Sequence, residues 1–384
     1  MRVAYYSPLP PQRSGIADYS AALLPELRRR VDVSVARPFN PPPRADVALY
    51  QLGNDPESGG WVYESLRRRP GLVVLHEVAL HGLVAGLTLG RGDRAAYLEA
   101  VQHEGGAAGR LAAERALAGL DPPLWETRPE EFPLLREALQ LAEGIVVHSE
   151  YAERRVREAG YERPVHRIPY PAPAESPPPV EEPLARTGAP MIGCLGKVNA
   201  AKRIPQLLTA FARLRRSFPE ALLVIAGEGA TSESIRVRLE RLGLEAGGEV
   251  LLLDYVSEDL FRGLVSRCDV CVSLRWPTLG ETSASAVAAL GAGTPLVVSD
   301  VGWFQELPDS VAAKIPVDEW EVDHLTAVLE LLASDSALRR GMADAARAYA
   351  RLELDLGRCA DAYAAALAVH NAASGVERTR SAET

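Results

Sequence analysis

The sequence predicts an α/β protein made of two doubly wound domains, and three observations support this fold class. Short apolar segments alternate with amphipathic segments of helical periodicity, which is typical of parallel sheets covered by helices. The alternation stops at a proline-rich stretch near the middle of the chain and then begins again. The length of 384 residues exceeds one ordinary core and suits two domains of middle size.

The first half of the chain carries strands and helices in regular alternation. A strand is expected where a short apolar run lies between turn residues, and a helix where apolar residues recur every three to four positions. The expected strands cover residues 3–7, 31–35, 47–52, 72–75 and 145–148. The expected helices cover residues 18–30, 63–69, 94–118 and 132–142.

Prolines separate the two halves. Residues 169–173 read Pro-Tyr-Pro-Ala-Pro, and three consecutive prolines follow Ser176. Because proline lacks an amide hydrogen and has a fixed φ, neither a helix nor a central strand continues through this stretch. We therefore expect an N-terminal domain over residues 1–170, a linker over residues 171–188 and a C-terminal domain over residues 189–355.

The second half repeats the strand–helix pattern. The expected strands cover residues 191–195, 222–226, 250–253, 270–274 and 295–299. The expected helices cover residues 204–216, 232–242, 258–267 and 282–290. The terminal segment 356–384 begins with a helical pattern at 357–370, which we expect to cross back to the N-terminal domain, and ends in a frayed tail from residue 372. Two similar domains on a stiff linker imply a central cleft between them, a preferred place for a ligand.

Composition and charge exclude several functional classes. The chain has 42 basic and 51 acidic residues, a formal net charge of −9, which argues against a nucleic-acid-binding protein. No run of about 18 apolar residues is present, and a strand pattern stands where a signal peptide would have its apolar core. We therefore expect a cytoplasmic protein with at most peripheral membrane contact. The arginine runs at 28–30 and 67–69 either contact anionic lipid or end solvated helices, where arginine complements the dipole.

The cysteines do not predict a metal centre. Cys268 and Cys271 have the spacing of a redox or metal motif, but no second cysteine pair or nearby histidine completes a zinc site. We expect buried thiols, the usual state of free cysteine, and we expect neither a metal nor a cofactor.

Lysine is scarce, and two of the lysines lie close together. Of the 42 basic residues only Lys197, Lys202 and Lys314 are lysine, which reflects either a compositional bias or a requirement for lysine at these positions. Lys197 and Lys202 follow Gly196 in the loop between a predicted strand and a predicted helix. Glycine permits close backbone approach and a helix N-terminus favours anions, so two ammonium groups here suit a diphosphate. The segment is not a P-loop, and the alternative is a solvated helix start.

A second candidate segment precedes the predicted helix 282–290. Gly280 permits a sharp bend, and the amides of Thr282 and Ser283 would be first-turn donors facing the carboxyl edge of the sheet. Glu281 is either a favourable helix-dipole residue or an acceptor for ligand hydroxyls.

Two features of the first half also lie at the expected carboxyl edge of a sheet. The segment 14–19, which includes Gly15, follows the first strand and reads alone as a turn and a helix cap. His76 ends the strand 72–75 and either exchanges protons in the cleft or is a structural histidine.

Taken together, these segments resemble the retaining, nucleotide-sugar-dependent glycosyltransferases with the GT-B fold, family four in the usual classification. The order of the matching segments is the specific part of the resemblance. They cover residues 14–16, 146–151, 196–211, 223–229, 255–257, 268–270 and 280–299.

The resemblance implies a GT-B fold, in which two Rossmann-like domains face a central cleft, and a nucleotide diphosphate sugar, such as a UDP or GDP sugar, as donor. The acceptor would be a glycan, a lipid-linked or a small molecule bound by the N-terminal domain. The residues implied at the donor diphosphate are Gly15, Lys197, Lys202, Thr282 and Ser283. Those implied at the transferred sugar are Gly280 and Glu281. Val256 would meet the base through its backbone. The catalytic residues implied are His76, Glu281 and Lys202.

One position departs from the family pattern. The family often carries a second glutamate eight positions after the first, which binds the ribose, whereas residue 289 is alanine. Either this chain belongs to a Gly-Glu-Thr-Ser branch without that glutamate, or it is a weakened copy. The resemblance implies front-face transfer with retention of configuration and without a metal. The alternatives are a nucleotide-sugar epimerase, a phosphorylase and a non-catalytic sugar-binding protein. The position of Lys314 before Pro316 argues against the phosphorylase.

Overall fold

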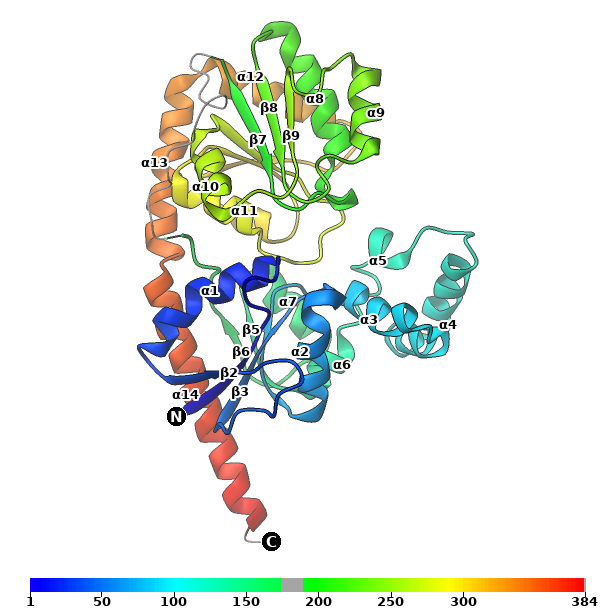
Figure 1. Cartoon of the computed structure of the whole chain (residues 1–384), viewed down its shortest axis with the longest axis vertical. Coiled ribbons are helices and arrows are strands. Elements are labelled where there is room, and N and C mark those ends of the chain that lie inside the picture. Colours follow the sequence, from blue (N-terminus) through cyan, green and yellow to red (C-terminus); the bar gives the residue numbers. More distant parts are fainter. Residues whose placement is uncertain (174–188, 383–384) are drawn as a thin grey trace. The chain divides into compact units, whose positions relative to one another are not determined.

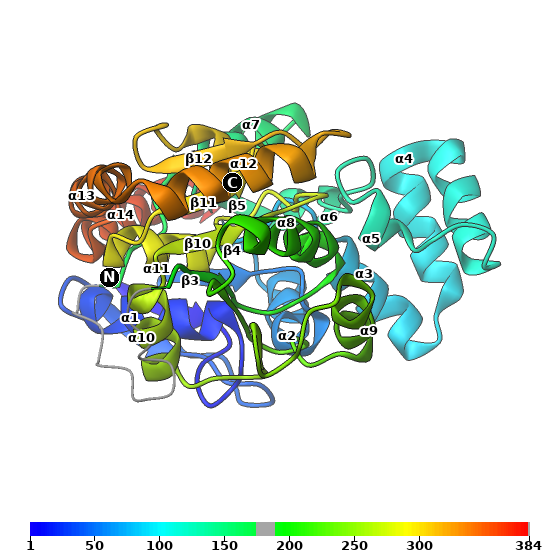
Figure 2. The ribbon, with the colours of Figure 1, turned by 90° about the horizontal axis from the view of Figure 1, so that it is seen from above.

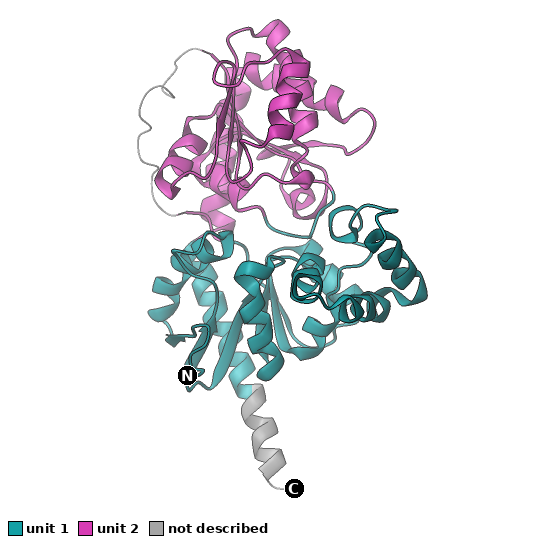
Figure 3. Cartoon of the chain, turned by 45° about the vertical axis from the view of Figure 1, so that its right-hand side comes forward, with its two compact units in different colours: residues 1–170, 277–282, 356–384 teal, residues 171–276, 283–355 magenta. Residues whose placement is uncertain are grey.

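The computed structural model describes residues 1–173 and 189–382, with the side chains of the last helix described as far as Ala372. It divides into two compact units (Figure 3). Unit 1 consists of Met1–Tyr170, Pro277–Thr282 and Leu356–Thr384, and unit 2 consists of Pro171–Trp276 and Ser283–Asp355. Most of the expected linker, residues 174–188, lies outside the described residues.

Unit 1 contains a parallel sheet (Figure 1). Its six strands have the order β2-β1-β3-β4-β5-β6. The strands are β1 (Arg2–Tyr6), β2 (Asp32–Val35), β3 (Val47–Leu52), β4 (Gly71–Leu75), β5 (Ala142–Val147) and β6 (Val165–Arg167). The helices are α1 (Gly15–Arg28), α2 (Pro56–Arg68), α3 (His81–Thr88), η1 (Leu89–Arg91), α4 (Arg94–Leu117), α5 (Leu124–Thr127), α6 (Arg136–Leu141), α7 (Glu150–Glu158) and α14 (Leu356–Ala382). Strand order reverses between β1 and β3, which makes their carboxyl ends the switch point of this sheet.

Both faces of the first sheet are covered, so the inner strands β1, β3, β4 and β5 are buried almost throughout. One face packs against α1 and α14 (Figure 1). The hydroxyl groups of Tyr19 on α1 and Tyr363 on α14 lie 2.6 Å apart. The other face packs against α2, α6 and α7. The helices α4 and α5 form a lobe beside α3, away from the sheet (Figure 2). Strands buried on both faces read as continuous apolar runs, which is why the sequence predicts them well.

Helices α2 and α6 of unit 1 begin at other residues than predicted, and helix α4 is kinked. Helix α2 begins at Pro56 rather than at residue 63, because the Asp55 side chain caps it at Ser58 N and two glycines mask its periodicity. Helix α6 begins only at Arg136, because Phe132 turns away to pack against glycines of α4. Helix α4 is kinked at Gly106, whose φ of 63° and ψ of −155° are not helical.

Unit 2 contains a second parallel six-stranded sheet, in the order β12-β11-β10-β7-β8-β9. The strands are β7 (Met191–Leu195), β8 (Leu222–Ala226), β9 (Val250–Leu253), β10 (Val270–Ser273), β11 (Leu296–Ser299) and β12 (Ala312–Ile315). The helices are η2 (Ala200–Lys202), α8 (Ile204–Ser217), α9 (Glu233–Leu242), α10 (Glu258–Arg267), α11 (Ala284–Ala292), η3 (Gly302–Glu306), α12 (Glu321–Ser334) and α13 (Ser336–Glu353). This is the Rossmann strand order, with the switch point between β7 and β10.

The predicted α/β fold with two doubly wound sheets is confirmed. Helix α14 extends to Ala382, beyond residue 372 at which the frayed tail is expected to begin. No helix among the described residues is long and apolar enough to cross a membrane.

Candidate functional site

In unit 2, the loop after β7 meets the start of α11 at the switch point. A Cβ atom on Gly196 would lie 3.8 Å from Lys202 Nζ and 3.8 Å from Ser285 Oγ. The Trp276 amide, which follows β10, donates a hydrogen bond of 2.8 Å to Ala201 O. Two segments that the sequence marks separately as phosphate-type features therefore lie side by side at the carboxyl edge of one sheet.

Glycines let the loops after β7 and β8 touch backbone to backbone. Gly196 has φ +102° and Gly227 has φ +143°, values that side-chain-bearing residues rarely adopt. A Cβ atom on Gly227 would lie 2.3 Å from Gly196 O, so no larger residue fits there. Hydrogen bonds of 2.8 Å from Gly196 N to Ala226 O and from Val198 N to Glu228 O close the contact. The loop that carries Lys197 and Lys202 is thereby fixed.

Lys202 ends η2 and is 5% exposed. The next residue, Arg203, adopts a left-handed conformation with φ +55° and binds the buried carboxylate of Glu321 at the start of α12. Its Nε donates a hydrogen bond of 3.0 Å to Glu321 Oε1, and a second nitrogen binds the other oxygen. This bidentate pair anchors the loop at the point where Lys202 enters the interior.

A second buried cation, Arg275, lies near Lys202 and is not among the residues predicted from the sequence. Arg275 follows β10, is 9% exposed and donates its amide to Ser299 Oγ at 2.8 Å. Burial raises the pKa of the Cys194 thiol at the end of β7, and the positive charges of Lys202 and Arg275 oppose that rise. Both cations therefore lie within electrostatic reach of one buried thiol. The signal that was available is a charged residue directly after a buried central strand.

Lys197 differs from Lys202 in being exposed. Its side chain is 66% exposed and pairs with Glu228, itself 57% exposed, at 3.2 Å. Exposed pairs of this kind contribute about 0–1 kcal/mol to stability. A stronger anion can therefore draw Lys197 away at little cost.

Three serine hydroxyl groups, one of them from β10, meet at the start of α11. Helix α11 begins at Ala284 rather than at the predicted residue 282, because the Ser283 side chain caps it by accepting from Ala286 N at 3.4 Å. Ser283 Oγ also lies 3.3 Å from Ser273 Oγ and 3.1 Å from Ser285 Oγ. The Ser283 side chain is thus part of the helix cap, and the first-turn amides beyond it point out of the helix end.

Gly280, Glu281 and Thr282 belong to unit 1, where they pack on the loop that begins with His76. Val78 N and Ala79 N donate to Leu279 O at 2.8 and 3.2 Å. Gly280 has φ +75°, and a Cβ atom there would lie 2.2 Å from a methyl group of Val78. The structure therefore brings the predicted sugar-binding segment to the loop after β4.

The Glu281 carboxylate folds back on its own turn. Its Oε2 accepts from Leu279 N at 2.8 Å and from Thr278 Oγ1 at 3.2 Å, which stabilises the bend at Gly280. Next to it, Thr282 Oγ1 is buried and has no hydrogen-bond partner among the residues that the structure describes. Glu281 therefore has a structural role, whatever it does toward a ligand.

His76 is buried beside a second histidine. It is 8% exposed, its Nε2 lies 2.8 Å from Gln51 Oε1, and its ring centre lies 5.0 Å from that of His148. Burial first, and the neighbouring His148 second, lower the pKa of His76 well below 6.5. His76 is therefore neutral at physiological pH.

The two remaining predicted residues lie at carboxyl edges, each in its own unit. Gly15 opens α1, where Ser14 Oγ accepts from Ile16 N at 3.3 Å, and a Cβ atom on Gly15 would meet no described atom within 4 Å. Packing within the described protein thus does not require glycine there. Val256 is half-buried in the loop between β9 and α10, directly before the cap residue Ser257.

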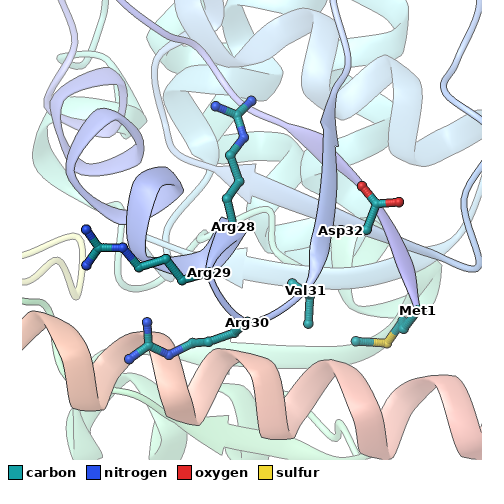
Figure 4. Close-up of a pocket in the computed structure, with 6 residues that line it drawn as sticks. All are labelled: Met1, Arg28, Arg29, Arg30, Val31 and Asp32. Atoms are coloured by element: carbon teal, nitrogen blue, oxygen red, sulfur yellow. The ribbon is translucent and has the colours of Figure 1, made fainter.

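The arginine run at the end of α1 lines an open hollow of about 550 Å³ (Figure 4). Arg29 and Arg30 pair with Glu26, and Arg30 also pairs with Asp361 of α14. The hollow lies at the amino edge of the sheet, opposite His76. In the second run, Arg67 pairs with Glu137. Because these arginines pair with acidic residues of the same unit, the structure favours helix ends over lipid contact as the role of both arginine runs.

The cysteines are buried free thiols. Among residues 1–173 and 189–372, whose side chains the structure describes, no group of three His, Cys, Asp or Glu side chains is arranged to hold a metal ion.

Two doubly wound parallel sheets, one of which has a glycine- and lysine-bearing loop at its switch point, define a protein of the GT-B class. Residues 180–349 match the family described as Glycosyl transferases group 1, so the chain carries a domain of that family. The predicted relation to GT-B glycosyltransferases is confirmed.

The chain is also similar to individual proteins. Glycogen synthase from Mycobacterium tuberculosis is 30% identical over 165 residues, which are 42% of this chain and 38% of that protein. The chain therefore matches less than half the length of this curated relative. Sucrose-phosphate synthase from Thermosynechococcus elongatus has a TM-score of 0.61 and 17% identity over 100% of both chains. Anabaena HepE in complex with UDP and glucose has a TM-score of 0.58 and 16% identity over 96% of this chain and 100% of that chain. At these identities the structural likeness concerns the fold.

Proposed function

We propose that this protein is a retaining glycosyltransferase that moves a sugar from a nucleotide diphosphate sugar to an acceptor hydroxyl group. The observation that carries the proposal is the meeting of Gly196, Lys202 and the first turn of α11 at the switch point of unit 2. It lies within the segment that matches Glycosyl transferases group 1. The HepE structure, which shares the fold, holds UDP and glucose, and this supports a nucleotide sugar as donor.

The donor diphosphate would bind at this switch point. Lys202 and Arg275 supply buried positive charge, Lys197 adds an exposed one, and the first-turn amides of α11 supply hydrogen-bond donors. A helix N-terminus beside ammonium and guanidinium groups is a favourable place for phosphate oxygens. In this proposal Lys202 is the principal charge on the leaving group, because burial strengthens its interaction with an anion.

The remaining roles follow from the family resemblance. The amides of Thr282 and Ser283 and the loop at Gly15 would complete the diphosphate site. Glu281, with Gly280 at its turn, would hold the sugar, and His76 would contact the sugar and the acceptor. Val256 would meet the base. Because Ala289 lies fully buried within α11, the ribose must be recognised by groups other than a glutamate at that position.

The proposed chemistry is a front-face substitution without a metal ion or other cofactor. The acceptor oxygen attacks the anomeric carbon on the face from which the diphosphate departs. The bond to the phosphate oxygen breaks, the new glycosidic bond forms, and the acceptor proton passes to a diphosphate oxygen. Positioning and the cations around the leaving group would lower the barrier. A cytoplasmic location, where nucleotide sugars are made, is part of the proposal.

A donor screen in two stages tests the function. Thermal shift with UDP, GDP, ADP and their sugars identifies the nucleotide, and the preferred donor is then incubated with a panel of acceptors. Transfer with retained anomeric configuration, read by NMR and unaffected by EDTA, is the expected result. An inverted product would contradict the mechanism.

Two alternatives have distinct outcomes in the same screen. An epimerase would convert the sugar nucleotide when no acceptor is present. A non-catalytic binding protein, which the alanine at position 289 suggests, would bind a nucleotide sugar without turnover in either condition. Either outcome would replace the transferase proposal.

A further inference from the structure

Three polar side chains from neighbouring strands share one face of the first sheet. In the parallel register Gln51 on β3 lies opposite Val74 on β4, and Val74 lies opposite Val146 on β5. His76 and His148 follow two positions after Val74 and Val146. Because successive side chains of a strand alternate between faces, Gln51, His76 and His148 all point to the face covered by α1 and α14.

The contacts of this cluster are specific. His76 Nε2 lies 2.8 Å from the side-chain oxygen of Gln51, and His148 Nδ1 lies 2.8 Å from the carbonyl oxygen of Ile168. Gln51 is 0%, His148 5% and His76 8% exposed. All three groups are therefore held by the interior of unit 1 rather than by solvent.

With the Gln51 amide oxygen turned toward His76, these contacts assign the position of each ring proton. An amide or carbonyl oxygen only accepts, so the nitrogen that faces it must carry the hydrogen. Neutral His76 is thus protonated at Nε2 and has a lone pair at Nδ1. By the same argument His148 is protonated at Nδ1. The two histidines adopt opposite tautomers.

The surroundings keep both rings neutral. The ionisable groups around His76 are His148 and Tyr19 of α1, and Tyr170, Tyr363 and Cys359 surround Tyr19 in turn. Burial lowers the pKa of His148 to about 4 and lowers that of His76 as well. The phenol groups remain protonated, because burial raises the pKa of Tyr19 and Tyr363.

The cluster is costly for the fold. Gln51 Nε2 and His148 Nε2 are buried and have no hydrogen-bond partner within the described part of the chain. An apolar side chain at position 51 would avoid that desolvation cost. A buried polar group whose hydrogen-bonding capacity is left unused needs an explanation other than packing, and a role toward a ligand is one.

We propose that Gln51 is a positioning residue that holds His76 as the neutral Nε2–H tautomer, so that the Nδ1 lone pair accepts a hydrogen bond from a hydroxyl group of the sugar or acceptor. This inference rests on the proposed function, which places His76 at the sugar. His148 supports this arrangement, because the buried neighbouring ring disfavours protonation of His76. Gln51 itself does not touch the substrate.

The first test reads the tautomer directly and does not depend on activity. The full chain is labelled with ¹⁵N-histidine, and the His76 resonances are assigned by their loss in His76→Gln. At pH 7 we expect a protonated, pyrrole-type Nε2 and an unprotonated, pyridine-type Nδ1 at His76. A protonated Nδ1, or a charged ring, would overturn the proposal without bearing on glycosyl transfer.

The second test places a carboxylate where the amide oxygen lies. In Gln51→Glu the charge should raise the pKa of His76 by about 1–3 units. Protonation then occupies Nδ1, so transfer should fall on the acid side of pH 7, where the wild type stays level. Gln51→Leu should instead show a mixture of tautomers and a lower rate at every pH.

A matched substitution separates this effect from a general change of charge. Gln140 is exposed on α6, and the control substitution is Gln140→Glu. We expect this variant to keep the wild-type pH profile of transfer. If Gln51→Glu and Gln140→Glu share the wild-type profile, Gln51 does not control His76. If Gln51→Glu fails to fold, the His76 tautomer measured in the wild-type protein still confirms or overturns the proposal.

Discussion

Arg203 holds the carboxylate of Glu321 in a bidentate pair, and this contact fixes the chain directly after Lys202. Glu321 is 2% exposed and lies 118 positions further along the sequence. The pair therefore links the loop after β7 to the start of α12. The position of the buried ammonium group depends on a residue outside the segments that the family resemblance marks.

We expect Glu321→Gln to destabilise the protein strongly. The substitution leaves the Arg203 guanidinium beside a neutral group, and breaking a buried pair costs about 3–5 kcal/mol. Urea unfolding measures this loss. Asp323→Asn, which removes the exposed pair with Arg213, should cost about 0–1 kcal/mol. Equal losses of unfolding free energy in the two variants would show that the buried pair stabilises the protein no more than the exposed pair.

Lys202→Ala should nearly abolish sugar transfer and leave the fold intact. Loss of one preorganised charge at a developing anion costs about 10²–10³ in rate. The matched control is Lys314→Ala, because Lys314 pairs with Asp309 at the end of the sheet far from the switch-point loop. Steady-state kinetics with the preferred donor compare the two. Near-normal turnover in Lys202→Ala would remove Lys202 from the mechanism.

Arg275→Gln should weaken the binding of a nucleoside diphosphate more than that of the matching nucleoside. Its buried charge acts on phosphate oxygens in the proposal, and charge-assisted hydrogen bonds contribute about 1.5–3 kcal/mol. Calorimetric titration of UDP and uridine, or of the nucleotide found by the screen, gives the comparison. Arg216→Gln on the exposed side of α8 should change neither affinity. Equal losses for diphosphate and nucleoside would contradict the assignment.

Two glycine substitutions should change stability in opposite directions. Gly227→Ala forces a Cβ atom against Gly196 O at a φ of +143°, so we expect a large loss of stability and of donor binding. Gly341→Ala lies in helix α13 in open space and should stabilise the protein by about 0.5–1 kcal/mol. Thermal unfolding checks both signs.

Acid should destabilise unit 1 through its buried histidines. Burial lowers the pKa of His81 to about 4, whereas the unfolded value is near 6.5. Between those values the unfolded chain binds more protons, so stability falls as the pH drops from 6.5 towards 4. At pH 5 this amounts to about 2 kcal/mol relative to pH 7. His81→Gln should reduce the difference between the two pH values, and exposed His103→Gln should not.

The local features of this fold could be predicted from the sequence, and the site only in part. The strands of both sheets appear as apolar runs because both faces are buried, and the Gly196–Lys202 loop stands out because glycine and lysine follow such a run. Arg275 and Gln51 do not stand out. Their significance depends on β10 lying beside β7 and on β3 lying beside β4, which are pairings between distant segments. The short edge strands β6 and β12 are not predicted either, because their position depends on pairing with β5 and β11.

Helix α14 completes the unit that begins with the first strand of the chain. Its Cys359, Tyr363 and Leu367 fill the core face that Val3, Tyr5 and Tyr19 begin. During synthesis on a ribosome, the whole of unit 2 emerges before α14 does. Unit 2 can therefore fold first, whereas one apolar face of the N-terminal sheet stays uncovered until α14 has been synthesised. The unit that is synthesised first is therefore the last to complete its core. A nascent chain released before residue 356 would expose the face of the first sheet that α14 covers.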